Sequence, residues 1–344
     1  MRNGRANHLE KGLALFRARA NWKHPVYLIH AVTARCNASC EFCAWKYSGD
    51  SDAELTTEEI KRLYRDARRS GFFWLSLWGG EPLVHRDIGE IAQHAHRLGF
   101  ATNMVTNGFL LERKMDEVVP FVDRICISVD HPSEKHDEIR GVKGLYERII
   151  NTTKKLRRKY PQKTVLYIYT MFKKNIDPAS VKKMAELTRT MRVVGVFNPL
   201  RDEAASEASG DIDLKQFIAS DEELSESFKL LRRLKKHGYP ILNSYTYINK
   251  LIKGHPKYHC HWPKFIMPIE ANGDVVDCMF WGKRTIDNVR DKRFSAILKN
   301  PRLRELAGED GEGCSKCVSL HRVEISEICE GNLEPLLSWA RAML

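Results

Sequence analysis

The feature that most constrains the fold is a regular alternation of short apolar runs with amphipathic stretches between residues 26 and 198. The runs that predict strands are 26–32, 72–77, 101–106, 124–129, 164–171 and 193–198. The stretches with helical periodicity are 56–70, 87–98, 111–120, 144–159 and 178–189. Strands that alternate with helices predict a parallel sheet with right-handed crossovers. Because six units are too few for a closed eight-stranded barrel, we expect an α/β fold with a partial (β/α)6 TIM barrel.

The remainder of the chain follows another pattern. A polar segment at 201–213 predicts a loop, and helical patterns span 221–237, 294–306 and 333–344. Two apolar runs flank Asn272-Gly273 within 265–277, which is a strong signal for a β-hairpin. We therefore expect four parts: a basic N-terminal segment (1–25), the barrel (26–237), a small domain built on the hairpin (238–330) and a C-terminal helix (331–344).

The composition is that of a globular protein with a sizeable core, with 43% hydrophobic and 29% charged residues. No apolar run approaches the roughly 18 residues that a membrane span needs. The N-terminus lacks the apolar stretch of a secretory signal. We therefore expect a cytoplasmic protein.

The net charge of +12 favours anionic partners. The densest basic runs, at 154–159 and 232–236, each end a predicted helix, where the helix dipole favours cations. Solvated helix ends explain these runs better than a nucleic-acid site does, so we do not expect nucleic acid as a partner.

Nine cysteines are many for a cytoplasmic chain, because disulfides are rare in that compartment. They lie at positions 36, 40, 43, 126, 260, 278, 314, 317 and 329. Cys126 stands alone inside an apolar run and is expected to be a buried thiol in a strand. Three others lie in Cys36-Asn-Ala-Ser-Cys40-Glu-Phe-Cys43, directly after the first predicted strand.

Three thiolates in so short a loop can converge on one centre. A disulfide would leave one of them over, and a tetrahedral zinc ion would need a fourth ligand nearby. A four-iron cubane held by three cysteines has one iron without a protein ligand, where a cofactor can bind. The CxxxCxxC pattern in a first β/α loop resembles the signature of the radical S-adenosylmethionine (SAM) superfamily. Thr33, Arg35 and Phe42 around the cysteines fit this resemblance.

The resemblance implies a chemistry for the loop. Cys36, Cys40 and Cys43 would hold a [4Fe–4S] cluster whose open iron is chelated by the amino and carboxylate groups of SAM. One electron, from a reductant such as ferredoxin or flavodoxin, would cleave SAM to methionine and a 5′-deoxyadenosyl radical. The radical would abstract hydrogen from a bound substrate, while the protein orients the cofactor and excludes competing reactions. No catalytic acid or base can be named from the sequence.

Further motifs at the ends of predicted strands resemble the SAM site of the family. Gly79-Gly80-Glu81 follows the second strand, where glycines allow close backbone approach and the carboxylate can accept from an ammonium group. Asn107 belongs to a Thr-Asn-Gly motif after the third strand, and Ser128 and Arg140 belong to an SxD…HDxxRG pattern after the fourth. The resemblance implies that these residues bind SAM, with Arg140 suited to its carboxylate. Taken alone, the same residues would suit turns or a charged surface.

The C-terminal cysteines form a second group. Cys260 precedes the predicted hairpin, Cys278 ends it, and Cys314 and Cys317 make a CxxC pair in the loop that follows. Four such thiolates can hold zinc or an iron–sulfur cubane. Their spacing resembles the SPASM/twitch extension of radical SAM enzymes, whose shorter twitch form implies one auxiliary [4Fe–4S] cluster that takes part in electron transfer. Cys329 is left either as a free thiol or as an alternative ligand.

The substrate is less constrained than the chemistry. The first hypothesis is a small molecule, such as an alcohol, a sugar or a lipid precursor. The second is a peptide or protein, as in the RiPP-type maturases of the SPASM family, although only about 25 residues precede the first strand and could form a peptide-binding module. The third is a non-enzymatic Fe–S or zinc protein that binds nucleic acid, for which Gly79-Gly80-Glu81 would have no use.

The N-terminal segment adds one further candidate partner. Leu9, Leu13 and Phe16 can share a helix face, and six basic residues accompany the single acid Glu10. A basic amphipathic helix can lie on an anionic membrane, and peripheral membrane contact would favour a lipid-like substrate. Packing against the open base of the barrel is the alternative for the same residues.

Overall fold

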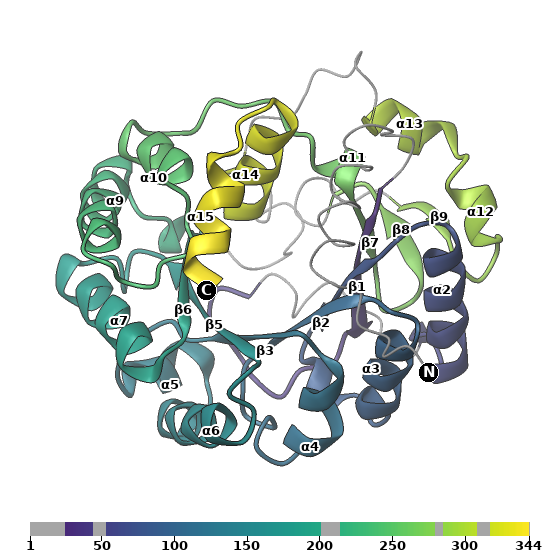
Figure 1. The fold of residues 1–344 in the computed structure, drawn as a ribbon, viewed down its shortest axis with the longest axis horizontal. Helices are drawn as coiled ribbons and strands as arrows, with labels where there is room; N and C mark the ends of the chain where they lie inside the picture. Colours follow the sequence, from purple (N-terminus) through teal and green to yellow (C-terminus); the bar gives the residue numbers. More distant parts are fainter. Residues whose placement is uncertain (1–24, 44–52, 201–213, 279–284, 308–316, 344) are drawn as a thin grey trace.

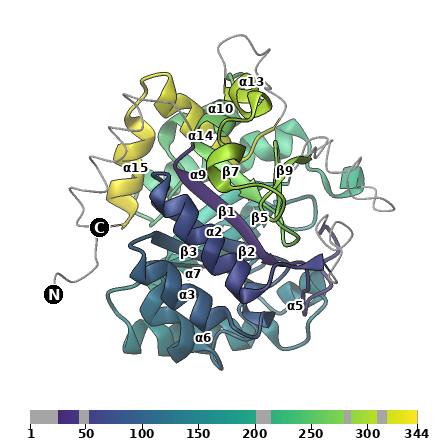
Figure 2. The ribbon, with the colours of Figure 1, turned by 90° about the vertical axis from the view of Figure 1, so that its right-hand side faces the viewer.

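A computed structural model describes residues 25–43, 53–200, 214–278, 285–307 and 317–343 of the chain. The N-terminal segment before Pro25 and the predicted loop at 201–213 lie outside these ranges. Figure 1 shows a curved wall of strands with helices around its outside. Figure 2 shows helix α2 running alongside strand β1, and the Tyr64 ring of α2 contacts the His30 ring of β1 edge-on.

The barrel wall is built from strands β1 (Tyr27–Thr33), β2 (Trp74–Gly79), β3 (Ala101–Thr106), β4 (Arg124–Ser128), β5 (Thr164–Met171) and β6 (Val194–Pro199). They are parallel, and neighbours in sequence are neighbours in the sheet, in the order β6-β5-β4-β3-β2-β1. The predicted partial (β/α)6 barrel is therefore confirmed. The carboxyl ends of all six strands lie at one end of the barrel, where parallel α/β folds bind ligands.

The predicted hairpin is confirmed, and it continues the barrel sheet. Strands β7 (Ile266–Ile269) and β8 (Asp274–Val276) are antiparallel around Gly273, whose φ of 92° suits glycine. β7 pairs in parallel with β1, with Ile266 opposite Tyr27. A further strand, β9 (Thr285–Asn288), pairs with β8 and was not predicted. The hairpin thus shares one sheet with the barrel. The division of the chain into four parts stays a prediction.

The helices follow the predicted ranges closely where the apolar period is clear. Those that pack outside the barrel strands are α2 (Thr57–Arg69), α3 (Ile88–Arg97), α4 (Met115–Val118), α6 (Leu145–Lys159), α7 (Pro178–Met191) and α9 (Asp221–Lys236). Thr56 and Glu59 form the capping box that starts α2. Short 3-10 turns complete the set: η3 (Pro82–Val84), η4 (Val119–Phe121) and η5 (Leu214–Phe217). Within the described ranges, no helix is long and apolar enough to cross a membrane.

One predicted helix is broken in two, and another is shorter than predicted. The helix predicted at 294–306 is two helices, α12 (Phe294–Ile297) and α13 (Pro301–Ala307), because a proline has no N–H and disfavours helical backbone in the residue before it. The helix predicted at 111–120 is only α4, which passes into η4 at Val119, next to Pro120. The helices that were not predicted are α5 (Lys135–Arg140), α10 (Tyr245–Ile252), α11 (Trp262–Phe265) and α14 (Leu320–Cys329). Helix α15 (Glu334–Met343) matches the predicted C-terminal helix.

Helix α14 covers the side of the barrel that six strands leave open. The backbone N–H of Leu320 donates to Asn198 Oδ1 of β6 at 2.9 Å, and Ile325 packs with Ile266 of β7. Figure 1 shows α14 and α15 across the gap between these two strands. Helix α14 buries polar residues such as Arg322 and Glu324 together with apolar ones, which is why its sequence carries no amphipathic pattern.

Three polar side chains meet in the amino halves of the first three barrel strands. Tyr27, Ser76 and Asn103 come from three neighbouring strands and form a chain of hydrogen bonds. The Tyr27 hydroxyl donates to Asn103 Oδ1 at 2.9 Å, and Asn103 Nδ2 donates to Ser76 Oγ at 2.7 Å. Arg124 of β4 lies opposite Asn103 in the strand register.

Candidate functional site

The three N-terminal cysteines lie in the loop after β1, at the carboxyl end of the barrel strands. Cys36 is exposed, Cys40 is buried and Cys43 is partly buried. Burial raises the pKa of the Cys40 thiol to about 11, and burial also raises the pKa of the Cys36 thiol. Since a bound metal favours the thiolate, these thiols are expected to lose their protons when a cluster binds.

Helix α5 fixes the cysteine loop through its backbone. The N–H groups of Ser39 and Glu41 donate to the carbonyl oxygens of Arg140 and Ile139, at 3.1 and 3.3 Å. Gly141, which ends α5, has a φ of 62°, and a Cβ on it would lie 2.1 Å from Ser39 Oγ. Glycine therefore suits this position for its backbone conformation and for the close approach of the loop, whose Ser39 carbonyl oxygen would lie 3.0 Å from the same Cβ.

Arg140 reaches from α5 to the cysteine loop. Its Nε donates to Asp130, a fully buried carboxylate directly after β4. Its Nη1 lies 3.6 Å from Cys40 Sγ, and the guanidinium lies over the Phe42 ring, 5.5 Å from the centroid. The ion pair with Asp130 thus holds a permanent cation beside a predicted cluster ligand.

Gly79 and Gly80 pack against the chain that leads into the cysteine loop. A Cβ on Gly79 would lie 2.4 Å from the Thr33 carbonyl oxygen, and one on Gly80 would lie 2.4 Å from that of Arg35. The Gly80 N–H also donates to the Thr33 carbonyl at 2.9 Å. The two glycines are thus needed to seat the cysteine loop on β2, and their contact with SAM stays a prediction.

Glu81 connects the ends of β2 and β3. Its buried carboxylate accepts hydrogen bonds from Leu83 N at 3.0 Å, Thr106 Oγ1 at 2.7 Å and Asn107 N at 2.6 Å. Burial raises the pKa of Glu81 to about 6, while the Asn107 N–H acts in the opposite direction. A carboxylate offers about four lone-pair sites, so these three donors leave one site for the ammonium group that the prediction assigns to Glu81.

Asn107 also contacts the cysteine loop. Asn107 Nδ2 donates to Asn37 Oδ1, between the first two cysteines, at 2.8 Å. Ser128 is buried at the carboxyl end of β4, in the register position opposite Ile168 of β5. The structure therefore gathers Glu81, Asn107 and Arg140 around the loop and leaves the role of Ser128 as a prediction.

Two residues that hold the loop were given no role by the sequence reasoning. Asp130, the acid of the SxD pattern, was given no role of its own, and it positions Arg140. Glu54 Oε1 accepts from Thr33 Oγ1 and from the Ala34 N–H, both at 2.7 Å. Nothing in the sequence pattern around Glu54 indicates that it folds back onto the end of β1.

The second group of cysteines gathers at α14. Cys278 and Cys317 both lie against Arg322, and the Tyr258 hydroxyl lies 3.2 Å from Cys317 Sγ. Cys260 packs beside the same region, in a cluster with Trp262, Ile266 and Cys329. Cys314, the fourth predicted ligand, lies outside the described residues.

The donor sets of both regions fit iron–sulfur clusters. Each offers cysteines from a short loop or a hairpin, with a guanidinium next to a sulfur atom. Among the described residues, no group of three His, Cys, Asp or Glu side chains could hold a single metal ion. A cubane spreads its cysteine ligands over separate irons, so that observation does not bear on a cluster.

The two cysteine groups lie toward opposite ends of β1. The loop with Cys36 follows the carboxyl end of this strand. Cys260 precedes β7, which starts beside the amino end of β1, and Cys278 follows β8, which runs back in the opposite direction. Seven strand residues of about 3.3 Å each span roughly 20 Å. The barrel interior thus lies between the two candidate centres.

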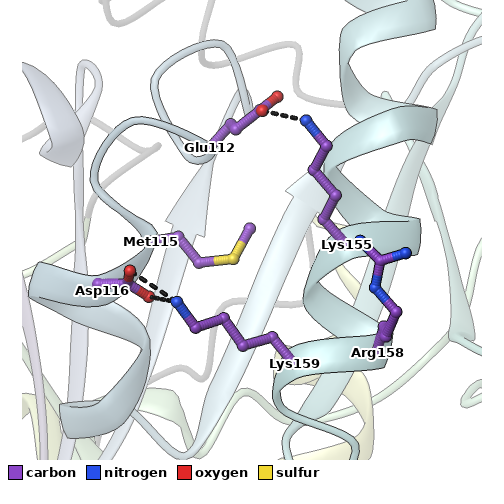
Figure 3. Close-up of a pocket in the computed structure, with 6 residues that line it drawn as sticks. All are labelled: Glu112, Met115, Asp116, Lys155, Arg158 and Lys159. Carbon is purple, nitrogen blue, oxygen red and sulfur yellow. Dashed lines mark hydrogen bonds and ion pairs between the residues drawn. The ribbon is translucent and has the colours of Figure 1, made fainter.

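A surface hollow contains part of the basic run at the end of α6. Figure 3 shows Lys155 paired with Glu112 and Lys159 paired with Asp116, the latter at 2.6 Å. The hollow is lined by Glu112, Met115, Asp116, Lys155, Arg158 and Lys159. These pairs favour the interpretation of the run as a solvated helix end, and the hollow contains none of the predicted site residues.

Family models match both regions. The model of the radical SAM superfamily matches residues 31–187, and the model of the SPASM iron–sulfur cluster-binding domain matches residues 260–318. The chain belongs to the radical SAM superfamily. As a radical SAM enzyme with a SPASM domain, it uses a SAM-binding [4Fe–4S] cluster, SAM and an auxiliary iron–sulfur cluster. Which cysteines hold each cluster remains the prediction made above.

Two curated relatives differ in how much of the radical SAM enzyme they match. The Fe-coproporphyrin III synthase of Methanosarcina barkeri is 25% identical over 346 aligned positions, covering 90% of this chain and 83% of its own. The PqqA peptide cyclase of Rhizobium meliloti is 36% identical over 128 positions, which is 36% of this chain and 34% of its own.

Solved structures share the fold. SuiB of Streptococcus suis bound to its precursor peptide SuiA has a TM-score of 0.66 at 15% identity, covering 91% of this chain and 74% of that one. The enzyme anSMEcpe with bound AdoMet has a TM-score of 0.62 at 15% identity, covering 92% and 95%. At these identities the likeness concerns the fold of the radical SAM enzyme and not its substrate.

Proposed function

We propose that this radical SAM enzyme modifies a side chain of a peptide or protein, with the auxiliary cluster taking part in electron transfer. The observation that carries the proposal is the placement of the two cysteine groups toward opposite ends of β1, with hydrogen-bonded polar side chains of β1, β2 and β3 in the barrel between them. A segment bound there would lie between the site where a radical is generated and a centre that can exchange an electron.

The comparisons support a peptide substrate over the small molecule that the sequence favoured. The relative with the higher identity is named a peptide cyclase, and a structure of the same fold holds a precursor peptide. In this proposal a separate partner or the barrel rim binds the peptide.

The residues around the cysteine loop would have distinct roles. The cluster with SAM bound would supply the 5′-deoxyadenosyl radical. Arg140 would hold its cation next to the cluster ligand Cys40 and present its remaining N–H groups to a carboxylate. Glu81 would offer its remaining lone pair to an ammonium group, and Asn107 would hold the cysteine loop against the end of β3. Each role requires the rim to be rigid, which the backbone bonds to α5 provide.

A small-molecule substrate is the second candidate. It is favoured by one observation, the similarity over 90% of the chain to a relative named as the synthase of a tetrapyrrole, Fe-coproporphyrin III. Arg124, the exposed first residue of β4, could pair with a carboxylate of such a molecule.

The test compares these candidates directly. Anaerobically reconstituted enzyme receives SAM and a reductant together with either peptides encoded by neighbouring genes or fractions of a metabolite extract. We expect a peptide to increase 5′-deoxyadenosine formation and to change in mass, with deuterium from the labelled peptide appearing in 5′-deoxyadenosine. Stimulation by a metabolite fraction alone would contradict the peptide proposal and favour the second candidate.

A further inference from the structure

The second cysteine group surrounds a buried arginine of α14. Arg322 Nη1 lies 3.2 Å from Cys317 Sγ, and its Nη2 lies 3.4 Å from Cys278 Sγ. The residue is 2% exposed, and its guanidinium lies over the Trp262 ring, 5.1 Å from the centroid. One planar cation thus contacts two sulfurs that come from segments far apart in the sequence.

The chemistry of the guanidinium suits this position. It stays protonated in proteins and presents its N–H donors in a rigid fork, so it can donate to two sulfurs at once. The face of Trp262 fixes the plane of the fork from one side. The Tyr258 hydroxyl, at 3.2 Å from Cys317 Sγ, adds another polar contact to the same sulfur. A lysine could not reproduce the two directed contacts.

We propose that Arg322 positions Cys278 and Cys317 as ligands of the auxiliary cluster and raises the reduction potential of that cluster. The oxidised cluster gains one negative charge when it accepts one electron. A neighbouring cation that donates hydrogen bonds to the ligand sulfurs stabilises the reduced form more than the oxidised form. Arg322 is therefore a positioning residue, which acts on the substrate only through the cluster.

The proposal depends on the auxiliary cluster and not on the substrate class. It holds whether the cluster exchanges its electron with a peptide radical or with the radical of a small molecule. Failure to find a peptide substrate would leave it intact, and its own failure would leave the proposed function intact. The measurement is accordingly made on the cluster itself.

The potential is measured on the full chain with Cys36, Cys40 and Cys43 replaced by alanine, so that the auxiliary cluster alone contributes the signal. Arg322→Gln is compared with Arg293→Gln, which removes an exposed cation from the same domain. At the midpoint potential of the parent, we expect the ratio of reduced to oxidised cluster in Arg322→Gln to be at least tenfold lower. A tenfold change corresponds to 59 mV for one electron. The Arg293→Gln midpoint should equal that of the parent.

Cluster content separates the two parts of the proposal. Loss of auxiliary iron from Arg322→Gln with an unchanged circular dichroism spectrum would support the positioning role. An unchanged midpoint together with full iron content would overturn the proposal. Arg322→Lys, which keeps the charge but not the fork, should give a midpoint between those of the parent and the glutamine variant.

A second measurement needs no substitution of Arg322. In the chain with Cys36, Cys40 and Cys43 replaced by alanine and labelled with guanidino-¹⁵N-arginine, the reduced auxiliary cluster should show ¹⁵N hyperfine coupling, because a guanidinium donates directly to its sulfur ligands. Absence of this coupling would overturn the proposal even if every Arg322 variant failed to fold. Coupling that persisted in a folded Arg322→Gln variant would come from another arginine and would overturn it as well.

Discussion

Arg140 Nη1 lies 3.6 Å from Cys40 Sγ, and Asp130 anchors the same guanidinium through Nε. This relationship joins three parts of the site: the end of β4, the end of α5 and the cysteine loop. Because the guanidinium is oriented before SAM binds, little ordering remains to be done when the cofactor arrives. The arrangement predicts that the charge and the geometry of Arg140 both matter for SAM cleavage.

Replacement of Arg140 by glutamine should lower reductive SAM cleavage by about tenfold or more, since a lost charge-assisted hydrogen bond costs about 1.5–3 kcal/mol. The measurement is the rate of 5′-deoxyadenosine formation under excess reductant. Arg113→Gln, which removes an exposed arginine from the outer surface, serves as the control and should cleave SAM at the parent rate. Equal rates for the two variants would argue against a role for Arg140.

Replacement of Cys40 by alanine should abolish 5′-deoxyadenosine production, because the SAM-binding cluster loses one of its three ligands. Cys126→Ala is the matched control, since Cys126 is also a buried thiol but lies in β4, away from the loop. It should keep its clusters and lose only about 1–2 kcal/mol of stability through the small cavity left by the sulfur. Retained SAM cleavage by Cys40→Ala would remove the cluster assignment.

Alanine variants at Gly141 and Gly144 separate the effect of backbone strain from the effect of a collision with the cysteine loop. Both have positive φ, 62° and 73°, so alanine at either should cost about 1 kcal/mol. Only at Gly141 would a Cβ collide with Ser39, because Gly144 has nothing within 4 Å of that position. Iron analysis and SAM cleavage should therefore fall in Gly141→Ala and stay at parent values in Gly144→Ala. A similar loss in both variants would contradict the proposed close approach.

Glu324 should make stability depend on pH. It is fully buried on α14, where it accepts from the Ser244 N–H at 2.7 Å and from Trp339 Nε1, and burial raises its pKa to about 7. A raised folded-state pKa gives stability that is complete below the unfolded value of about 4.5 and is lost as pH rises through about 7, by up to about 3 kcal/mol.

Denaturant midpoints between pH 4.5 and 8 test this linkage. The parent should lose more stability across that window than Glu324→Gln, whose amide does not titrate. Other groups that face Glu324, Glu334 of α15 and Lys235 of α9, contribute the same background to both proteins. The exposed variant Glu305→Gln should keep the parent slope. Parallel slopes for parent and Glu324→Gln would disprove the linkage.

The barrel and its motif-bearing loops could be predicted because each depends on local sequence. The predicted strand ranges 101–106 and 164–171 agree with β3 and β5. The spacing of apolar residues and the presence of β-branched residues set the bounds of such a strand within a few positions along the chain. The Asn272-Gly273 turn was equally local. Helix α14 was missed because partners from α10, α15 and the cysteine loops satisfy its buried polar residues, and these partners are distant in sequence.

The same division applies to the site. Sequence spacing by itself determined the six-unit barrel, the two cysteine groups and the motifs that belong with the first group, because residue type and spacing along the chain carry that information. Only the tertiary structure decided that Arg140, anchored by Asp130, contacts Cys40, and that Arg322 lies between Cys278 and Cys317. It also decided that β7 joins β1 and sets the two groups apart. These relationships arise from side chains and strands that meet across long separations in sequence, where packing and buried charge select the partner and no local pattern records the choice.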